Sequence, residues 1–374
     1  MIWILAALVA GSCVYCAMVV VAARKYLAVR PPPPANLEAV SILKPLHGVD
    51  EGLEQNLRTF FEQIYPNFEI LFAVRDAKDP AVDLVRRLCA EYSRVPTRLV
   101  ITGEPPYPNA KVWSLHLMME QASSDLLIMS DSDIRVSRDM VRTIAAEFQD
   151  PRLGVTTCPY RAVPGKSIWS TLEAIGMNTE FLSGILVARM LEGMRFAVGP
   201  TIAARRTVIR AIGGWDRLQQ YLAEDFMLGN LAAEAGHGVA LSSFVVEHRI
   251  GGERWRPNFA HRIRWNRSTR RSRPAGYIGE VFTNPLPLAL ALWAWAPTWG
   301  PLAIAALAVR AAAVLASSQW VLKDPLTRRL WWAVPLQDLL SFAFWVAGFF
   351  GNTILWRGSR YKLLRDGRFE VVPR

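Results

Sequence analysis

Cysteine is scarce in this chain and forms no pattern that supports a disulfide framework. Only 4 of the 374 residues are cysteine, whereas small disulfide-stabilised scaffolds are rich in it. Cys13 and Cys16 have C-x-x-C spacing, but they lie in an apolar run, where we interpret them as small packing residues. Cys89 and Cys158 are expected to be reduced thiols of a cytosolic domain. These features exclude a disulfide-rich secreted protein.

Charged residues are absent from a long stretch near the N-terminus. Ile2 to Ala23 is an uncharged run of about 22 residues, enough for a helix to cross a hydrocarbon core of ~30 Å. No basic segment precedes it, whereas Arg24 and Lys25 follow it directly, which reverses the charge order of a cleaved signal peptide. We therefore predict an uncleaved transmembrane anchor at residues 1–24, with the following chain in the cytoplasm.

A second apolar region occupies the C-terminal third. We predict spans at Pro285 to about Trp299, at Pro301 to Leu322 and at Leu330 to Trp356. For the third span, the alternative is that its first turns lie along the interface. The loop Lys323 to Arg329 and the tail after residue 356 are both basic, so both are expected in the cytoplasm. One crossing between them cannot satisfy both expectations. A re-entrant or interfacial segment would resolve the conflict, but the sequence does not locate it.

A recognisable nucleic-acid-binding module is also missing, although the net charge is +11. Such a module would interleave aromatic residues with the basic ones. The basic residues cluster instead at the borders of the apolar regions, in Arg24 to Arg30, Arg262 to Arg273 and Arg357 to Arg368. We interpret this charge as contact with anionic lipid, and we expect a membrane partner and no nucleic acid.

Between the apolar regions, strand and helix patterns alternate. After the polyproline segment Pro31 to Pro34, which we interpret as a stiff spacer, buried runs typical of strands alternate with amphipathic helical patterns. The strands are Val40 to Leu43, Phe68 to Val74, Thr97 to Ile101 and Leu126 to Ser130; the helices are Leu53 to Gln63, Ala81 to Tyr92 and Lys111 to Ala122. This alternation predicts an α/β fold with a mostly parallel sheet, in which ligands bind beyond the carboxyl ends of the strands.

Carboxylates follow two of these strands. Asp131-Ser132-Asp133 comes directly after Leu126 to Ser130, and the two Asp can share one Mg²⁺ or Mn²⁺ that keeps open positions for diphosphate oxygens. The alternative is an exposed Asp- and Ser-rich turn. Asp76 follows the second strand and can accept from the imide of uracil, with Asp79 as a solvated neighbour. The alternative here is a helix-capping Asp before Pro80.

Three further groups complete the candidate site. Lys111, at the start of a predicted helix, can contact a bound nucleotide donor, although it can also be a surface lysine. Glu224 and Asp225 lie among apolar residues, where partial burial raises a carboxylate's pKa and suits Asp225 to act as a general base, with Glu224 orienting either Asp225 or the acceptor. The alternative is a pair of acids at a helix N-terminus. Arg264 can bind a diphosphate and Trp265 can floor an acceptor site, unless they belong to a juxtamembrane basic helix.

The order of these motifs resembles that of family 2 and family 21 glycosyltransferases, with D, D-x-D, E-D and (Q/R)-x-x-R-W. It most resembles the ceramide glucosyltransferase family over residues 40–364. The matching segments are Lys44 to Asp50, Phe60 to Pro66, Tyr221 to Phe226 and Trp356 to Tyr361. Thr179 to Ala203 and His261 to Tyr277 are similar to the bacterial branch associated with hopanoid lipids, whose members add N-acetylglucosamine to a hopanoid polyol. His261 stands where the pattern has Gln or Arg, and animal ceramide enzymes have Gly in place of Asp133.

The resemblance implies a GT-A type nucleotide-sugar-binding domain flanked by transmembrane helices. Carried over by position, Asp76 and Asp131 would bind the nucleotide, Asp133 the metal, Asp225 would be the base, and Arg264 and Trp265 would be the last motif. With the residues considered above, the candidate site comprises Asp76, Lys111 and Asp131 for the donor, Asp131 and Asp133 for the metal, and Asp225, Glu224, Arg264 and Trp265 for catalysis. We expect an anchor at 1–24, a linker at 25–39, the catalytic domain with interfacial helices at 40–280, membrane helices at 281–356 and a cytosolic tail at 357–374.

The implied reaction is transfer of glucose or N-acetylglucosamine, with inversion, from a UDP-sugar to a hydroxyl of a membrane lipid. A ceramide and a hopanoid are both open as acceptors. The expected location is the bacterial inner membrane, as a multi-pass protein with a cytoplasmic catalytic domain. Two alternatives remain open: a processive polysaccharide synthase, and a non-catalytic membrane scaffold that keeps a sugar-nucleotide fold.

Overall fold

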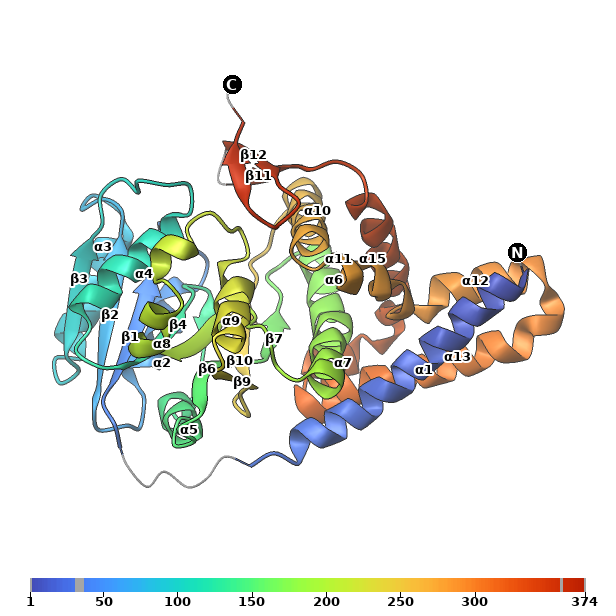
Figure 1. Cartoon of the computed structure of the whole chain (residues 1–374), viewed down its shortest axis with the longest axis horizontal. Coiled ribbons are helices and arrows are strands. Elements are labelled where there is room, and N and C mark those ends of the chain that lie inside the picture. The colour runs from blue at the N-terminus through green and yellow to red at the C-terminus, as the bar shows by residue number, and fades with distance from the viewer. Residues whose placement is uncertain (1, 31–36, 357–358, 373–374) are drawn as a thin grey trace. The chain divides into compact units, whose positions relative to one another are not determined.

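The computed structural model describes residues 2–30, 37–356 and 359–372 and divides the chain into two compact units (Figure 1). The sheet unit comprises Arg30–Tyr160 and Met194–Arg249, and the helical unit comprises Met1–Val29, Arg161–Gly193 and Ile250–Arg374. Residues 161–193 and 250–280, which we assigned to the catalytic domain, therefore group with the helical unit. The predicted spacer Pro31 to Pro34 and parts of the basic tail (357–358 and 373–374) lie outside the described residues.

The sheet unit contains a seven-stranded sheet with strand order β3-β2-β1-β4-β8-β6-β9. Its elements are β1 (Val40–Pro45), α2 (Leu53–Phe61), β2 (Phe68–Val74), α3 (Ala81–Glu91), β3 (Thr97–Ile101), α4 (Ala110–Gln121), β4 (Leu126–Ser130), β5 (Ile134–Arg135), α5 (Met140–Glu147), β6 (Leu153–Thr157), β8 (Thr201–Arg205), α8 (Arg206–Ala211), the 3₁₀ turn η2 (Trp215–Arg217), α9 (Glu224–Glu234), β9 (Gly238–Leu241) and β10 (Val246–Arg249). The pairs β1–β2, β1–β4, β2–β3 and β6–β9 are parallel, and β8 is antiparallel to both β4 and β6.

The parallel pairs confirm the predicted mostly parallel α/β sheet. The prediction succeeds because the central strands are continuous apolar runs. Strands β2, β3 and β4 have the predicted bounds residue for residue. All five residues of β4 are buried, as central strands of a sheet covered on both faces should be. Helix α4 packs against β1 and β2, and its Val112, Leu115 and Met118 join the core. The carboxyl ends of β1, β2 and β4 consequently meet at one edge.

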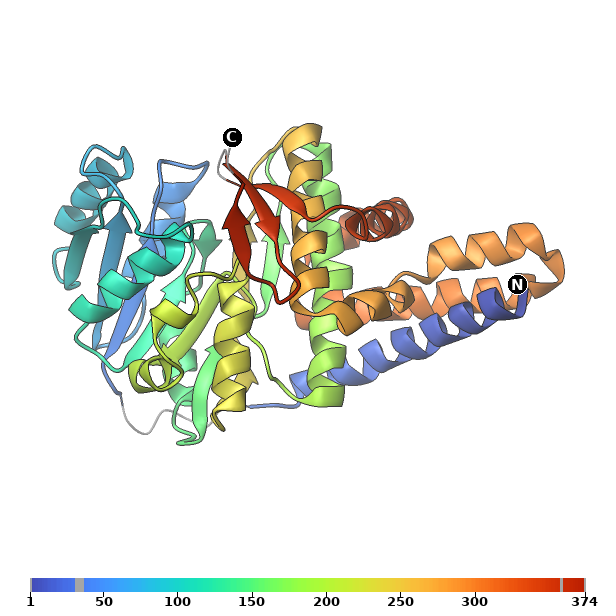
Figure 2. The same cartoon turned by 45° about the horizontal axis from the view of Figure 1, so that its top comes forward.

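The helical unit is built around long apolar helices. Its elements are α1 (Ile2–Leu27), α6 (Ile168–Gly176), the π-helical turn η1 (Met177–Phe181), α7 (Leu182–Glu192), α10 (Trp255–Ser272), α11 (Pro274–Gly279), η3 (Glu280–Phe282), α12 (Pro285–Trp295), η4 (Pro297–Trp299), α13 (Gly300–Val314), η5 (Leu315–Val321), α14 (Pro325–Arg329), η6 (Trp331–Ala333), α15 (Val334–Gly348) and the hairpin strands β11 (Thr353–Trp356), β12 (Ser359–Leu363) and β13 (Phe369–Val371). Strand β7 (Tyr160–Val163) lies where the chain passes between the units. Helix α1 packs along α13 and α12, as Figures 1 and 2 show.

The apolar helices differ in part from the predicted spans. Among the described residues, Ile2–Leu27 and Pro297–Val321 are long and apolar enough to cross a membrane, whereas Pro285–Trp295 is shorter. The predicted span from Leu330 to Trp356 is not one helix. Helix α15 ends at Gly348, Gly351 adopts a φ of 77°, and Thr353–Trp356 pairs with β12 as a strand. A glycine at positive φ allows the chain to leave the helix and turn.

Candidate active site

The acidic triplet lies at the carboxyl edge of the sheet. Asp131 follows β4, and its backbone N–H donates to the carbonyl of Pro200 at 2.9 Å. Lys111, in the first turn of α4, places its Nζ 2.7 Å from Asp131 Oδ1 and 3.2 Å from Glu224 Oε1. Burial opposes the charge of Lys111, but the two carboxylates outweigh it and raise its pKa. Lys111 is thus not the isolated surface lysine of our alternative interpretation, because it joins two of the predicted acidic groups.

Asn109 ties the same helix to the Glu224 loop. Its side-chain oxygen accepts from the backbone N–H of Val112 at 3.2 Å and so caps α4. Its Nδ2 donates to the carbonyl of Tyr221 at 3.0 Å and to Glu224 Oε2 at 3.3 Å. Because Asn109 is fully buried, these bonds fix the position of Glu224 relative to the start of α4.

Asp225 lines a small hollow beside this network. The hollow is lined by Lys111, Gly199, Trp215 and Glu224 together with Asp225 and four apolar neighbours. Burial and the adjacent charge of Glu224 raise the pKa of Asp225 to about 6, against the opposing charge of Lys111. Glu224 and Asp225 form the first turn of α9, so our alternative interpretation also describes their position. The raised pKa is what a general base near neutral pH requires.

Close packing of α9 holds Asp225 in place. A Cβ at Gly229 would lie 2.2 Å from the backbone nitrogen of Ala197 and 2.4 Å from the carbonyl carbon of Phe196. We expect Gly229→Ala to destabilise the protein by about 1–3 kcal/mol and to lower activity, because α9 must move away. Gly279→Ala is the matched control, since a Cβ there meets nothing within 4 Å. Thermal unfolding of the two variants in detergent measures the difference; equal melting temperatures would contradict it.

Asp133 has the surroundings expected of a cation ligand. Its Oδ2 lies 3.0 Å from His248 Nε2, whereas its Oδ1 is buried without a hydrogen-bond partner. Burial opposes ionisation of Asp133, but His248 and Lys44 outweigh it and hold the pKa of Asp133 below its usual range. An ionised carboxylate with an unsatisfied buried oxygen fits a divalent metal ion. Within the described ranges, no group of three His, Cys, Asp or Glu residues is arranged to hold a metal.

Lys44 lies beneath the acidic triplet, and sequence reasoning assigned it no role. It is fully buried in β1, and its Nζ donates to the carbonyl of Asp131 at 2.5 Å and lies over the ring of Phe60. Burial lowers its pKa to about 7, although Asp131 and Asp133 oppose that shift. Burial also raises the pKa of Asp131, against the charge of Lys111. A lysine inside an apolar strand was the available signal.

Asp76 is exposed, whereas Asp79 lacks the solvated position that we expected. Asp76 is exposed after β2, and its Oδ1 accepts from the backbone N–H of Lys78 at 2.9 Å. Asp79 is not a solvated neighbour: its side chain is 8% exposed and accepts from the N–H of Gly48 at 3.1 and 3.0 Å. Asp79 also accepts from the N–H of Ala81 at 2.9 Å. It therefore joins the loops that follow β1 and β2, and it leaves Asp76 as the accessible carboxylate.

Arg264 and Trp265 lie on α10 in the helical unit. The Trp265 ring packs against the rings of His261 and Phe181, with centroids 5.0 and 6.1 Å apart. His261 Nδ1 lies 3.2 Å from Glu173 Oε1 on α6. The sequence predicted no partner for His261, and the structure pairs it with Glu173. The structure thus brings together four candidate residues of the sheet unit: Lys111, Asp131, Glu224 and Asp225. Arg264 and Trp265 belong to the helical unit.

The fold has a counterpart among solved structures. A mannosyltransferase from Pyrobaculum calidifontis, solved with GDP-mannose and Mn²⁺, has a similar fold, with a TM-score of 0.56, 19% identity and coverage of 93% of this chain and 98% of that one. The fold is therefore that of the GT-A glycosyltransferases.

The sequence comparisons show the family. The profile of Glycosyl transferase family 21 matches residues 3–369, so this chain belongs to that family. Ceramide glucosyltransferase 1 of Caenorhabditis elegans is 28% identical over 213 residues, which are 56% of this chain and 45% of that protein. The probable glycosyltransferase YdaM of Bacillus subtilis is 23% identical over 236 residues, 62% of this chain and 55% of that one. The chain spans about half the length of these curated relatives.

Proposed function

We propose that this chain is an inverting glycosyltransferase that moves a sugar from a UDP-sugar to a hydroxyl of a membrane lipid. The observation that carries the proposal is the position of Asp225, in a hollow beside the Lys111, Asp131 and Glu224 network. Membership of family 21 and the similarity to ceramide glucosyltransferases support a lipid acceptor. Glucose and N-acetylglucosamine are the candidate sugars, and a ceramide and a hopanoid are the candidate acceptors.

In the proposed reaction, Asp225 accepts the proton of the lipid hydroxyl. The hydroxyl oxygen attacks the anomeric carbon of the donor, the bond from that carbon to UDP breaks, and UDP leaves with the bonding electrons. One displacement inverts the anomeric centre without a covalent enzyme intermediate. Glu224, held by Asn109 and Lys111, positions the first turn of α9 and hence Asp225.

The donor is assigned to the carboxyl edge of the sheet. Asp76, the exposed carboxylate after β2, would accept from the uracil imide, and Asp131 would bind the nucleotide. Asp131 and Asp133 would hold Mg²⁺ or Mn²⁺, which when bound neutralises charge on the diphosphate. Arg264 would bind the diphosphate and Trp265 would form the floor of the acceptor site; these two roles rest on residue chemistry and on the place of both residues in the last motif.

The activity is expected to rise with pH through about 6. Asp225 must be ionised to accept a proton, and its pKa is raised to about 6; below that pH the carboxyl is protonated and turnover falls about tenfold per pH unit. Replacing Lys111 by Met removes the positive charge that lowers this pKa, so the profile should move to higher pH. Turnover measured from pH 4.5 to 8 provides the check, and a flat profile through pH 6 would remove Asp225 as the base.

Release of UDP distinguishes an enzyme from a scaffold. The purified full chain in mixed phospholipid vesicles, supplied with Mn²⁺ and a UDP-sugar, is expected to release UDP faster when a ceramide or a hopanoid polyol is added. A rate of UDP release that does not change when lipid is added would contradict a lipid acceptor. No release at all would favour the scaffold. A product that carries many sugars would instead favour a processive synthase.

We expect a multi-pass protein of the bacterial inner membrane with a cytoplasmic sheet unit.

A further inference from the structure

Helix α15 carries a row of apolar residues on its exposed face. Leu336, Leu339 and Val346 are 52%, 41% and 39% exposed, and Ala343 between them is also exposed. Their spacing of three or four residues places them on one side of a helix. Trp331 and Trp332, just before the helix, are 71% and 62% exposed. In water this continuous apolar face would be a costly surface.

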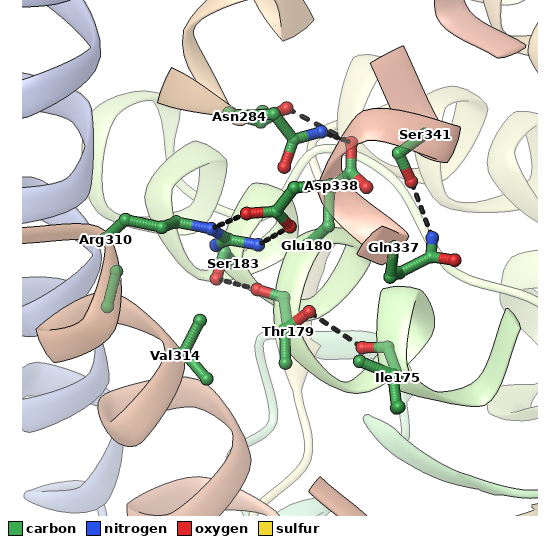
Figure 3. A network of polar contacts seen from close by, with 12 residues as sticks. Ile175, Thr179, Glu180, Ser183, Asn284, Arg310, Val314, Gln337, Asp338 and Ser341 are labelled. Carbon is green, nitrogen blue, oxygen red and sulfur yellow. Dashed lines mark hydrogen bonds and ion pairs between the residues drawn. The ribbon is translucent and has the colours of Figure 1, made fainter. Parts of the chain in front are cut away.

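The buried face of α15 carries three polar residues beside the apolar Val334 and Phe344. Gln337, Asp338 and Ser341 are almost completely covered. Asp338 accepts from Arg310 of α13 at 2.9 Å (Nε) and 2.7 Å (Nη2), and Gln337 donates to Ser341 at 2.7 Å. Figure 3 shows these side chains facing the interior from several helices, with Glu180 and Asn284 joined at 2.7 Å nearby.

This distribution is the inverse of that in a water-soluble helix. A soluble helix turns its apolar stripe inward and its polar stripe outward, whereas a helix in lipid keeps ionisable groups paired inside the protein and its apolar side chains outside. Helix α15 follows the second pattern. The same Arg310 lies in the long apolar segment Pro297–Val321, so the paired charges connect α15 to a candidate membrane span.

Both ends of α15 lie at basic, polar groups. The exposed Arg328 and Arg329 precede its start. At its other end, Arg267 Nε donates to the carbonyl of Phe350 at 2.9 Å and Arg270 Nη2 donates to that of Gly351 at 2.6 Å. The 3₁₀ turn η6 adds 3 residues to the 15 of α15, which gives a helical segment of about 28 Å at 2.0 and 1.5 Å per residue, beside a hydrocarbon core of ~30 Å. Among the described residues, this segment is not one of the two that are long and apolar enough to cross a membrane.

We propose that α15 is embedded in one leaflet of the bilayer, with its apolar face against lipid hydrocarbon, and that it does not cross the membrane. Trp331 and Trp332 then lie at the interface, where Trp side chains concentrate, and Arg328 and Arg329 face the headgroups. The loop before α15 and the tail after it lie on the same side of the membrane. This placement resolves the conflict between the two basic segments. It does not depend on the proposed enzymatic activity.

Accessibility of introduced cysteines tests the topology. Arg328→Cys and Arg365→Cys change exposed residues on either side of α15, so both variants should fold. In sealed vesicles of each orientation, a membrane-impermeant maleimide is expected to label both from the same side. The native Cys89 of the sheet unit serves as the reference, and the unmodified chain gives the background. Labelling of the two positions from opposite sides would overturn the proposal.

Lipid crosslinking tests the second part of the proposal. The full chain is placed in phosphatidylcholine vesicles that contain a lipid with a diazirine in its acyl chain, and the adducts are mapped by mass spectrometry after illumination. We expect adducts at Leu336, Leu339 and Val346 at levels comparable to those of α1, and none on Gln337 or Ser341. Adducts on α1 and Pro297–Val321 without any on α15 would show that another partner covers this face and would overturn the proposal.

Discussion

Asp225→Asn is expected to reduce turnover by about 10²- to 10⁴-fold, the contribution that a positioned general base makes. Asparagine keeps the shape of the side chain and can still accept from the N–H of Phe226, as Asp225 Oδ1 does at 2.8 Å, but it cannot take a proton. Binding of UDP is expected to stay within a few-fold of the unmodified chain, because the proposed nucleotide contacts come from Asp76 and Asp131. Single-turnover rates and UDP titration separate the two effects.

Glu234→Gln is the matched control for this variant. Glu234 is exposed and lies on the same helix, α9, so its change removes one carboxylate without touching the hollow around Asp225. Its turnover should equal that of the unmodified chain. Near-normal turnover in Asp225→Asn, with UDP binding retained, would show that another group accepts the proton.

Removal of divalent metal is expected to abolish activity, and Asp133 is expected to control its restoration. The buried Oδ1 of Asp133 lacks a hydrogen-bond partner and its Oδ2 lies beside His248. After EDTA treatment, Mn²⁺ should restore turnover in the unmodified chain but not in Asp133→Asn. His248→Gln should raise the Mn²⁺ concentration needed by about 10- to 100-fold, as changes to groups that support a metal ligand do.

Asp139→Asn serves as the control for the metal experiments, since Asp139 is exposed and close in sequence to the triplet. Its Mn²⁺ requirement should be that of the unmodified chain. Mn²⁺ binding can also be followed without turnover, by the loss of its electron paramagnetic resonance signal on addition of protein. Equal Mn²⁺ binding by Asp133→Asn and the unmodified chain would remove Asp133 as a ligand.

The central strands could be predicted because each is a continuous apolar run that ends at polar residues. Asp131 follows from the same pattern, since the buried run of β4 ends directly before it. The antiparallel strand β8 could not be predicted in this way. Its place between β4 and β6 depends on pairing across 71 residues, as between Ser130 and Thr201, and local periodicity carries no information on such pairing.

The supporting residues of the site were missed for a related reason. Lys44 contacts a carbonyl 87 residues away, and His248 contacts a carboxylate 115 residues away, so the partner of neither residue can be predicted from the sequence around it. Leu330 to Trp356 was predicted as a span because apolar residues predominate in it. Hydropathy does not show that Gln337, Asp338 and Ser341 share the covered face of a helix that ends at Gly348.

Mass spectrometry and NMR of the lipid product provide the decisive test of sugar transfer to a membrane lipid with inversion. The full chain in vesicles is given Mn²⁺, UDP-glucose and UDP-N-acetylglucosamine together with a ceramide and a hopanoid polyol. We expect a lipid carrying one sugar, with an anomeric configuration opposite to that of the donor; a hexosylceramide or an N-acetylhexosaminyl hopanoid identifies donor and acceptor. Release of UDP and free sugar without a glycolipid, or a glycolipid that retains the donor's configuration, would contradict it.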